Sequence, residues 1–319
     1  MTAKNAFVVA GLSAGAGTKV TGFIPVAGTT VQMPTTVVNG VEPGPTVLVT
    51  GGVHGGEYPG IQAAITLAGE LDPARVRGQV IVVHVVSPLA FHARQQYVVP
   101  QDGKNLNRQF PGSKLGTVTE RIAHTIMTEV ASKATAWVDL HGGDIHEALV
   151  PFTIVSQGAA PAVRDAAWRM AEVYGIPYVV ASDSVAGGTY GAAATAGIPC
   201  ILTEAGQCGQ LDDANTQIHL RGLRNVLKLL GVLPGQPEPV APVQKLEHFP
   251  WVRAGQAGCW YPAVKVGEQV AAGAPVGEIR DYFGKVLEAY TAPAAGVVMF
   301  VVTSLAINGD DPLVAVGAE

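Results

Sequence analysis

Two residues with metal-binding side chains lie three positions apart in a glycine-rich segment. His54 and Glu57 belong to the run Gly-Gly-Val-His-Gly-Gly-Glu, which directly follows the apolar residues 46–50. The apolar run is typical of a buried strand, and glycines let the backbone fold closely around a turn. We therefore expect an imidazole and a carboxylate to face a common point at the end of a strand.

A second histidine is found in a similar context. His141 follows the apolar-rich residues 136–140, precedes two glycines and lies two positions after Asp139. Catalytic zinc sites commonly use three protein ligands, such as two histidines and one carboxylate, and leave the fourth position open. A lone His-x-x-Glu pair is common by chance, and a buried histidine is usually a core residue. Two histidines beside paired glycines favour a metal site of His54, Glu57 and His141. Asp139 is expected either to orient His141 or to have a structural role.

Two further motifs carry polar groups suited to a substrate site. Asn107 and Arg108 lie in the turn-rich run Asp-Gly-Lys-Asn-Leu-Asn-Arg-Gln-Phe-Pro-Gly. A guanidinium there could hold a carboxylate by two parallel hydrogen bonds, or pair with a neighbouring acid to fix the loop. Glu204 follows the apolar residues 198–203 and precedes Ala-Gly. Its carboxylate is expected either in the same crevice at the strand ends or as a helix cap.

The segments around these motifs alternate between strand and helix patterns. Strands are expected at residues 20–26, 31–38, 46–50, 79–86, 136–140, 177–181 and 198–203. Helices are expected from about Pro59 and at residues 119–132, 162–174 and 217–230. This alternation predicts an α/β domain whose strands present functional side chains at their carboxyl ends.

The composition changes near residue 240. Residues 233–243 contain four prolines, which predicts a stiff linker, and residues 251–316 show short β-like runs separated by glycine-rich turns. We therefore expect a catalytic domain at residues 1–235, a linker at 236–245 and a β-rich domain at 246–319.

Charge and hydropathy exclude several classes of protein. The chain has 20 basic and 25 acidic residues, a net charge of −5 and 48% hydrophobic residues. It is therefore neither disordered nor typical of nucleic-acid binding, and its apolar runs are too short to span a membrane. Three cysteines without a Cys-x-x-Cys pair fit a reducing compartment. Lys4 before the apolar residues 6–12 resembles a secretory signal only weakly, so we expect a cytoplasmic protein.

The motif set resembles that of the succinylglutamate desuccinylase/aspartoacylase family, within the zinc carboxypeptidase superfamily. The similarity covers roughly residues 45–232 in motif order and rests on His54-x-x-Glu57, Asn107-Arg108, His141 and Glu204. It implies a zinc carboxypeptidase-like domain, with a mixed sheet between two helix layers. A small all-β domain similar to a barrel-sandwich hybrid would follow. It also implies one Zn²⁺ per chain, bound by His54, Glu57 and His141.

The resemblance further implies roles for the other motif residues. Glu204 would be the general base and proton shuttle, and Asn107 with Arg108 would hold a substrate carboxylate. Family members carry another arginine, which stabilises the oxyanion, five residues before the Asp of the Asp-Gly turn. Counting back from Asp102 gives Tyr97 here. Either Tyr97 or Arg94, three residues earlier, is then the candidate for that role, unless zinc serves alone.

The implied reaction is hydrolysis of the amide bond of a small N-acyl amino acid by metal-activated water. Within the family the substrates include succinyl-glutamate, acetyl-aspartate and acetyl-diaminobutyrate, and the β-rich tail is most similar to the last group. A metallocarboxypeptidase acting on peptides is the nearest alternative, because only the depth of the pocket separates the two. The expected partner is a small molecule, and a homodimer is compatible with the resemblance.

Two other interpretations concern particular residues. Residues 255–318 resemble biotinyl and lipoyl carrier domains, but Lys285 lacks the flanking residues of a carrier lysine. An ordinary hairpin lysine is therefore expected there. His146 and Glu147 follow His141 closely and are expected in a solvated loop rather than in the pocket. A zinc-binding scaffold without activity is disfavoured by the presence of Glu204.

Overall fold

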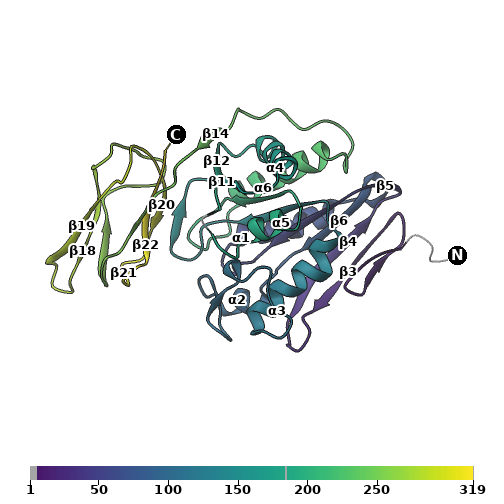
Figure 1. Ribbon diagram of the computed structural model, residues 1–319, viewed down its shortest axis with the longest axis horizontal. Coiled ribbons are helices and arrows are strands. Elements are labelled where there is room, and N and C mark those ends of the chain that lie inside the picture. Colours follow the sequence, from purple (N-terminus) through teal and green to yellow (C-terminus); the bar gives the residue numbers. More distant parts are fainter. Residues whose placement is uncertain (1–5, 184, 319) are drawn as a thin grey trace.

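A large mixed sheet with helices on both faces forms the main body of the protein (Figure 1). The computed structural model describes residues 6–183 and 185–318. Within these residues the sheet has nine strands in the order β14-β12-β11-β13-β9-β5-β6-β4-β3. They are β3 (Thr18–Pro25), β4 (Gln32–Asn39), β5 (Glu42–Gly51), β6 (Arg77–Val83), β9 (Ala136–His141), β11 (Phe152–Val155), β12 (Tyr178–Ala181), β13 (Cys200–Glu204) and β14 (Gln244–Leu246).

The centre of this sheet is parallel. Strands β6, β5, β9 and β13 lie side by side and run in the same direction. Their continuous apolar runs are buried, as expected for strands covered on both faces. The carboxyl ends of β5, β9 and β13 therefore meet at one edge of the sheet, which confirms the arrangement predicted from the strand pattern.

Helices cover both faces of the sheet. The apolar sides of α1 (Tyr58–Glu70), α4 (Pro161–Tyr174) and α6 (Asp213–Leu229) share one core with the strands. On the other face α3 (Val118–Thr125) and α5 (Thr189–Thr195) contribute to a second core, and the short α2 (Pro88–Ala93) follows β6. The predicted layer of sheet between two helix layers is therefore confirmed.

The helix predicted at residues 119–132 is shorter than expected. Helix α3 ends at Thr125, and a π-turn (Ile126–Val130) and a 3-10 turn (Ala131–Lys133) continue it. The hydroxyls of Thr125, Thr128 and Ser132 each donate to the carbonyl four residues earlier. Such bonds bend helices, which the apolar periodicity does not reveal.

The apolar run near the start of the chain is part of a hairpin. Strand β1 (Phe7–Val9) pairs with β2 (Leu12–Ala14), while Lys4 lies outside the described residues. No helix among the residues that the structure describes is both long enough and apolar enough to cross a membrane.

The C-terminal part consists of two antiparallel sheets around a separate apolar core that includes the buried Trp260. This confirms the predicted small all-β fold. Lys285 lies at the turn between two of its strands, where its backbone N–H donates to the carboxylate of Asp281 over 2.9 Å. The strands are β15 (Trp251–Arg253), β16 (Gly258–Pro262), β17 (Gln269–Val270), β18 (Pro275–Arg280), β19 (Val286–Thr291), β20 (Gly296–Val302), β21 (Ala306–Ile307) and β22 (Pro312–Gly317).

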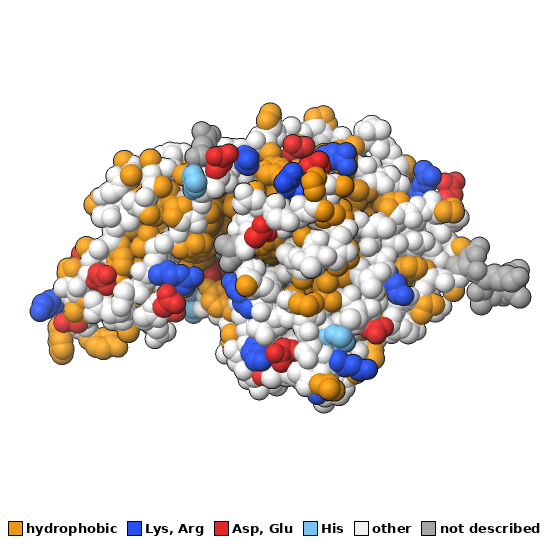
Figure 2. Space-filling view, in the orientation of Figure 1, with side chains coloured by type: hydrophobic (Ala, Val, Ile, Leu, Met, Phe, Trp, Pro, Cys, Tyr) orange, Lys and Arg blue, Asp and Glu red, His pale blue; other side chains and the backbone are white. Residues whose placement is uncertain are grey.

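Strand pairing joins the two parts of the chain. Strand β10 (Glu147–Leu149), which lies within residues 1–235, pairs with β20 of the C-terminal part. Strand β14 pairs with β12, although residues 244 and 245 are predicted to be linker. Its Leu246 enters a core shared by both parts, and that buried contact explains the pairing. A hollow with apolar side chains along it lies between the two parts (Figure 2).

Gly222→Ala is expected to lower the free energy of unfolding by about 1–3 kcal/mol. An added Cβ at Gly222 in α6 would lie 2.4 Å from the ring of Tyr174, which is fully buried and bonded to His219. Gly69→Ala in α1 is the control, because a Cβ there meets open space. It should be neutral or stabilising by up to about 1 kcal/mol. Urea unfolding curves compare the two, and equal stabilities would contradict the close packing of α4 on α6.

Candidate active site

His54 and Glu57 lie in the tight turn between β5 and α1, and His141 is the last residue of β9. Because β5 and β9 are parallel neighbours, these side chains emerge at the same edge of the sheet. The glycines between His54 and Glu57 are needed for this turn. A Cβ on Gly55 would lie 2.2 Å from the backbone nitrogen of Phe91, so only glycine fits.

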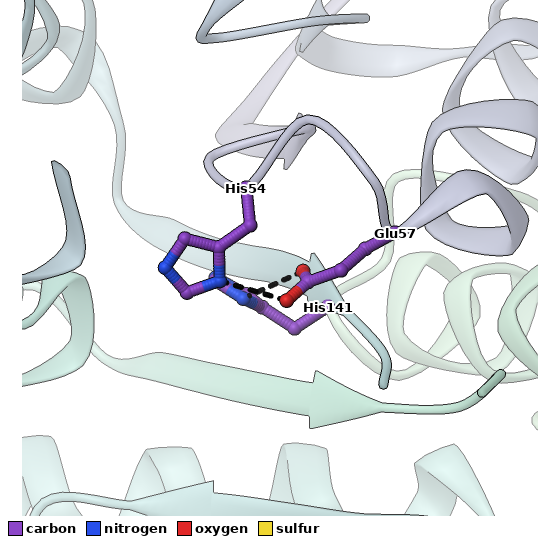
Figure 3. Close-up of side chains that lie close together, drawn as sticks. All are labelled: His54, Glu57 and His141. Atoms are coloured by element: carbon purple, nitrogen blue, oxygen red, sulfur yellow. Dashed lines mark hydrogen bonds and ion pairs between the residues drawn. The ribbon is translucent and has the colours of Figure 1, made fainter. Parts of the chain in front are cut away.

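The three predicted ligand residues converge on one point (Figure 3). His54 Nδ1 lies 2.7 Å from Glu57 Oε1, and His141 Nδ1 lies 2.9 Å from Glu57 Oε2. One ligand atom from each residue lies within 4.8 Å of the other two. All three side chains are buried, so the cluster is shielded from bulk solvent.

The outer nitrogens of both imidazoles are already occupied. His141 Nε2 lies 3.0 Å from Asp139 Oδ2, and His54 Nε2 lies 3.0 Å from the side-chain oxygen of Asn105. Both partners are acceptors, so each Nε2 donates its hydrogen to them. The Nδ1 atoms therefore face the Glu57 carboxylate either protonated or sharing a cation. Histidine ligands of metals usually donate their other N–H in this way.

Asp139 is itself fixed by two hydroxyl groups. Thr50 donates to Oδ1 and Thr189 donates to Oδ2, each over 2.5 Å. Of the two roles expected for Asp139, the structure therefore shows the orienting one. Asn105 is a partner of His54 that the sequence analysis did not single out.

Electrostatics reflect this arrangement. Burial by itself would raise the pKa of Glu57, but His141 and His54 lower it to about 2. Burial would likewise lower the pKa of both histidines, yet the Glu57 carboxylate raises the pKa of His54, and Glu57 with Asp139 raises that of His141 further. The cluster thus holds positive charge against a carboxylate in a dry environment.

Glu204 ends β13, where it pairs in register with His141 on β9. Its Oε2 is inaccessible to solvent and has no hydrogen-bond partner among the described residues. Burial and the negative charge of Glu57 raise the pKa of Glu204 well above its usual range. A buried carboxyl group beside the cluster, with a raised pKa and an unpartnered oxygen, is suited to exchange a proton in general acid–base catalysis.

Asn107 and Arg108 lie in a 3-10 turn that lines the same pocket (Leu106–Arg108). The side-chain oxygen of the buried Asn107 accepts the N–H of Thr189 over 2.9 Å, which fixes the turn. The guanidinium of Arg108 donates to the carbonyl of Asn107. Within the described ranges no carboxylate forms an ion pair with Arg108, so a loop-fixing ion pair is not seen. Arg108 is accessible from the pocket.

The two candidates for the missing family arginine point to different places. Tyr97 lines the pocket, and its ring lies 5.9 Å from that of His54, edge to face. Arg94 lines a separate surface cavity, with Tyr58 and Leu211 among its neighbours. Both residues have a left-handed backbone, with φ near 50–60°. The predicted approach of Arg94 to the pocket is therefore not found, because the turn directs it to the outer surface.

Glu147 corrects the prediction of a solvated loop at residues 146–147. The side chain is buried in the pocket wall, and its carboxylate accepts the Tyr97 hydroxyl and the N–H of Asp144. Burial raises the pKa of Glu147 to about 7. His146 is exposed and lines a neighbouring hollow instead. The burial of Glu147 follows from its pairing with β20, about 150 residues later, and local sequence carries no signal of that pairing.

These groups surround one cavity of about 310 Å³. It lies between the carboxyl ends of the central strands and the C-terminal sheets, in the hollow of Figure 2. The cavity brings together the predicted residues His54, Glu57, Glu204, Asn107, Arg108 and Tyr97. His141 contributes through its contact with Glu57. Such a site brings together three residues that could hold a metal ion, a carboxyl group with an unpartnered oxygen and a guanidinium group.

Comparison with known proteins identifies the family. A model of the succinylglutamate desuccinylase/aspartoacylase catalytic domain matches residues 43–230, more than half of the chain. This chain belongs to the succinylglutamate desuccinylase/aspartoacylase family. The matched range contains the cluster of His54, Glu57 and His141 as well as Glu204 and Arg108, so the family's catalytic domain coincides with the candidate site.

Individual relatives agree with the assignment. The N-alpha-acetyl-L-2,4-diaminobutyric acid deacetylase of Halomonas elongata is 32% identical over 263 residues, which cover 79% of this chain and 75% of the relative. The product-bound ectoine utilization protein EutE (DoeB) from Ruegeria pomeroyi has a TM-score of 0.87 at 29% identity, covering 94% and 95% of the two chains. The succinylglutamate desuccinylase/aspartoacylase from Rhodobacter sphaeroides has a TM-score of 0.84 at 31% identity, covering 93% and 94%. Because the two structural matches cover more than nine tenths of this chain, the structural similarity includes the C-terminal part.

Glu147 gives stability a pH dependence that can be measured on metal-free protein. Its carboxyl keeps a proton up to about pH 7 when folded, but loses it near 4.5 when unfolded. Stability therefore falls between these values as pH rises, by at most about 3 kcal/mol. Glu147→Gln removes this loss, so its stability relative to the wild type should increase from pH 4 to pH 8. Chemical unfolding in chelator checks this, with the exposed Glu172→Gln as control. A constant difference across this range would contradict the burial of an ionisable Glu147.

Proposed function

We propose that this protein is a zinc-dependent deacylase that hydrolyses the amide bond of a small N-acyl amino acid. The observation that carries the proposal is the convergence of two imidazole Nδ1 atoms and the Glu57 carboxylate beside Glu204 and Arg108 in one cavity. Catalytic zinc sites commonly have this donor set. The relative from Halomonas elongata, a deacetylase by name, supports the same class of reaction.

Zinc is proposed to bind between His54, Glu57 and His141. These residues fit a zinc ion because both rings direct Nδ1 toward Glu57. Nε2 of His54 is held by Asn105, and Nε2 of His141 is held by Asp139. When bound in such a site, zinc lowers the pKa of water and polarises the carbonyl group to be attacked. The hydrogen bond from His141 Nε2 to Asp139 makes Nδ1 of the same ring a stronger electron-pair donor to a metal ion.

The protein's own groups bind and orient the substrate. Arg108, which has no acidic partner among the described residues, is proposed to hold the carboxylate of the amino acid. Asn107 fixes the turn that carries Arg108 through its bond to Thr189. Holding the carboxylate at one end positions the amide bond beside Glu204, and this positioning contributes to the rate.

Glu204 is proposed to move the proton. Its unpartnered Oε2 can accept a proton from the attacking water and return it to the departing amine. Tyr97 is proposed to turn its hydroxyl from Glu147, its acceptor in this structure, to the carbonyl oxygen of the substrate as negative charge develops there. Tyr97 is the candidate because it lies in the pocket and Arg94 does not.

The C-terminal part is proposed to restrict the substrate to small molecules. Residues from β15 and β20 close one side of the cavity, and about 310 Å³ leaves little room for a polypeptide. This favours a deacylase over a metallocarboxypeptidase. We retain residues 1–235 as the catalytic domain, residues 236–245 as the linker and residues 246–319 as the covering domain. A cytoplasmic location, which the three free cysteines support, and a homodimer remain predictions.

Metal content is the first test. The purified protein should carry about one zinc per chain, and His141→Ala should carry much less, because one of three ligands is lost. His146→Ala is the matched control, since His146 is exposed outside the pocket. Elemental analysis measures both. A wild-type protein without metal that is also insensitive to chelators would contradict the proposal.

Glu204→Gln separates the base from the metal ligands. The amide keeps the shape of the side chain but cannot accept a proton, so turnover of N-acetyl-diaminobutyrate should fall by about 10²–10⁴-fold. Zinc content should persist, because Glu204 is not among the proposed ligands. Turnover and zinc are measured on the same preparation. Wild-type turnover in this variant would remove Glu204 from the mechanism.

Tyr97→Phe and Arg94→Ala test the oxyanion role. If Tyr97 donates to the developing charge, its loss should lower kcat by about 10²–10³-fold and change KM little. Arg94→Ala should keep turnover near the wild-type value, because this side chain lies in a separate cavity. Steady-state kinetics distinguish the two. A large loss of kcat in Arg94→Ala with an active Tyr97→Phe would reverse the assignment.

A further inference from the structure

Aromatic side chains form a continuous wall along one side of the cavity. The ring centroids of Phe152 and Phe249 are 5.3 Å apart, those of Phe249 and Trp251 are 5.6 Å apart, and those of Trp251 and Phe300 are 4.9 Å apart. All four residues line the cavity. We call Phe152, Phe249, Trp251 and Phe300 the aromatic wall.

The aromatic wall begins next to the proposed base. Phe152 on β11 pairs in register with Glu204 on β13, and the wall continues outward into the C-terminal part. Phe152 and Phe300 are buried, Phe249 is half-buried, and 42% of Trp251 is exposed at the outer end. A single exposed aromatic ring is ordinary on a protein surface. A row of rings that leads from the base to the mouth leaves apolar surface for a ligand to cover.

The acidic groups of the cavity offer little to a substrate ammonium group. Glu147 accepts hydrogen bonds on both carboxylate oxygens, from Tyr97 and from the N–H of Asp144. Glu247 at the mouth is exposed and lies 3.3 Å from the ammonium group of Lys245. The other acidic residues that line the cavity, Glu57 and Glu204, belong to the proposed metal centre and base. The carboxylates that line the cavity in the described part of the chain are therefore all engaged elsewhere, which leaves a cationic side chain without an ion-pair partner.

We propose that the aromatic wall is a subsite for an apolar group of the substrate. The inference rests on the proposed amide hydrolysis and names its substrate class, an N-acyl amino acid with an apolar acyl chain or an apolar side chain. An apolar acyl chain and an apolar side chain would make the same kind of contact with the rings, while Arg108 holds the carboxylate. Each methylene group buried against the wall should increase affinity or kcat/KM by about fourfold.

Two substrate series test the proposal with the zinc-loaded enzyme. The first extends the acyl chain on glycine from acetyl to butanoyl to hexanoyl. The second keeps the acetyl group and extends the side chain from glycine to 2-aminobutyrate to norleucine. We expect kcat/KM to rise at least tenfold along one series, which identifies the source of the apolar group. It should also exceed the value for N-acetyl-diaminobutyrate.

Variants connect the effect to the aromatic wall. Trp251→Ala should reduce the rise along the favoured series severalfold. Tyr282→Ala should leave the rise unchanged, because Tyr282 is 90% exposed away from the cavity. Calorimetry of hexanoylglycine and N-acetylnorleucine with Glu204→Gln measures binding without turnover. There too, Trp251→Ala in the same background should weaken the tighter ligand.

The outcomes separate the two proposals. If both series are flat and N-acetyl-diaminobutyrate is the best substrate, the subsite is wrong while the deacylase stands. If the zinc-loaded protein hydrolyses none of the compounds, the deacylase fails, and calorimetry alone then decides on the subsite. The subsite proposal is overturned if the longest ligands bind no more tightly than acetylglycine. It is also overturned if Trp251→Ala leaves their binding unchanged.

Discussion

Two imidazole nitrogens and a carboxylate that meet in a dry interior require a cation between them. The Nδ1 atoms of His54 and His141 lie 2.7 and 2.9 Å from the oxygens of Glu57, and their other nitrogens are already engaged. Burying a carboxylate is costly unless its charge is compensated. Protons on the imidazoles, or one divalent ion, supply that charge.

The fold brings these atoms together through close backbone contacts at the strand ends. A Cβ on Gly142, after His141, would lie 2.5 Å from the carbonyl oxygen of Ala205, after Glu204. His219 on α6 connects the same two segments, since its Nε2 lies 3.1 Å from the carbonyls of both His141 and Ala205. Burial lowers the pKa of His219 to about 4, so it donates as a neutral ring. Helix α6 thereby fixes His141 and Glu204 relative to each other.

The sequence predicts those parts of the protein that depend on local pattern. Continuous apolar runs identify β5, β9 and β13, and the polar residues just after them, His54, His141 and Glu204, meet at one edge as expected. Parts that depend on distant partners could not be predicted. Strands β10 and β14 are three residues long, and only their pairing with β20 and β12 makes them strands.

The same limit applies to the site. Glu147 resembles a loop residue because its burial comes from β20, far along the chain. Spacing in the sequence makes Arg94 and Tyr97 equal candidates for the pocket. Both have a left-handed backbone, which turns their side chains in different directions. Asn105 lies inside a motif that was recognised, yet its bond to His54 depends on how β7 (Val98–Val99) and β8 (Lys104–Asn105) fold back. Local pattern thus predicts the convergence of His54, Glu57 and His141 better than the residues around them.

Calorimetric titration of the metal-free protein with zinc, in buffers of different ionisation enthalpy, tests the central claim most directly. Glu57 raises the pKa of His54, and Glu57 with Asp139 raises that of His141 well above its usual range, so zinc bound at these nitrogens must displace protons. The account predicts release of about one proton or more per zinc at pH 7, and an apparent affinity that increases with pH. Zinc binding without proton release, or with an affinity independent of pH, would contradict it.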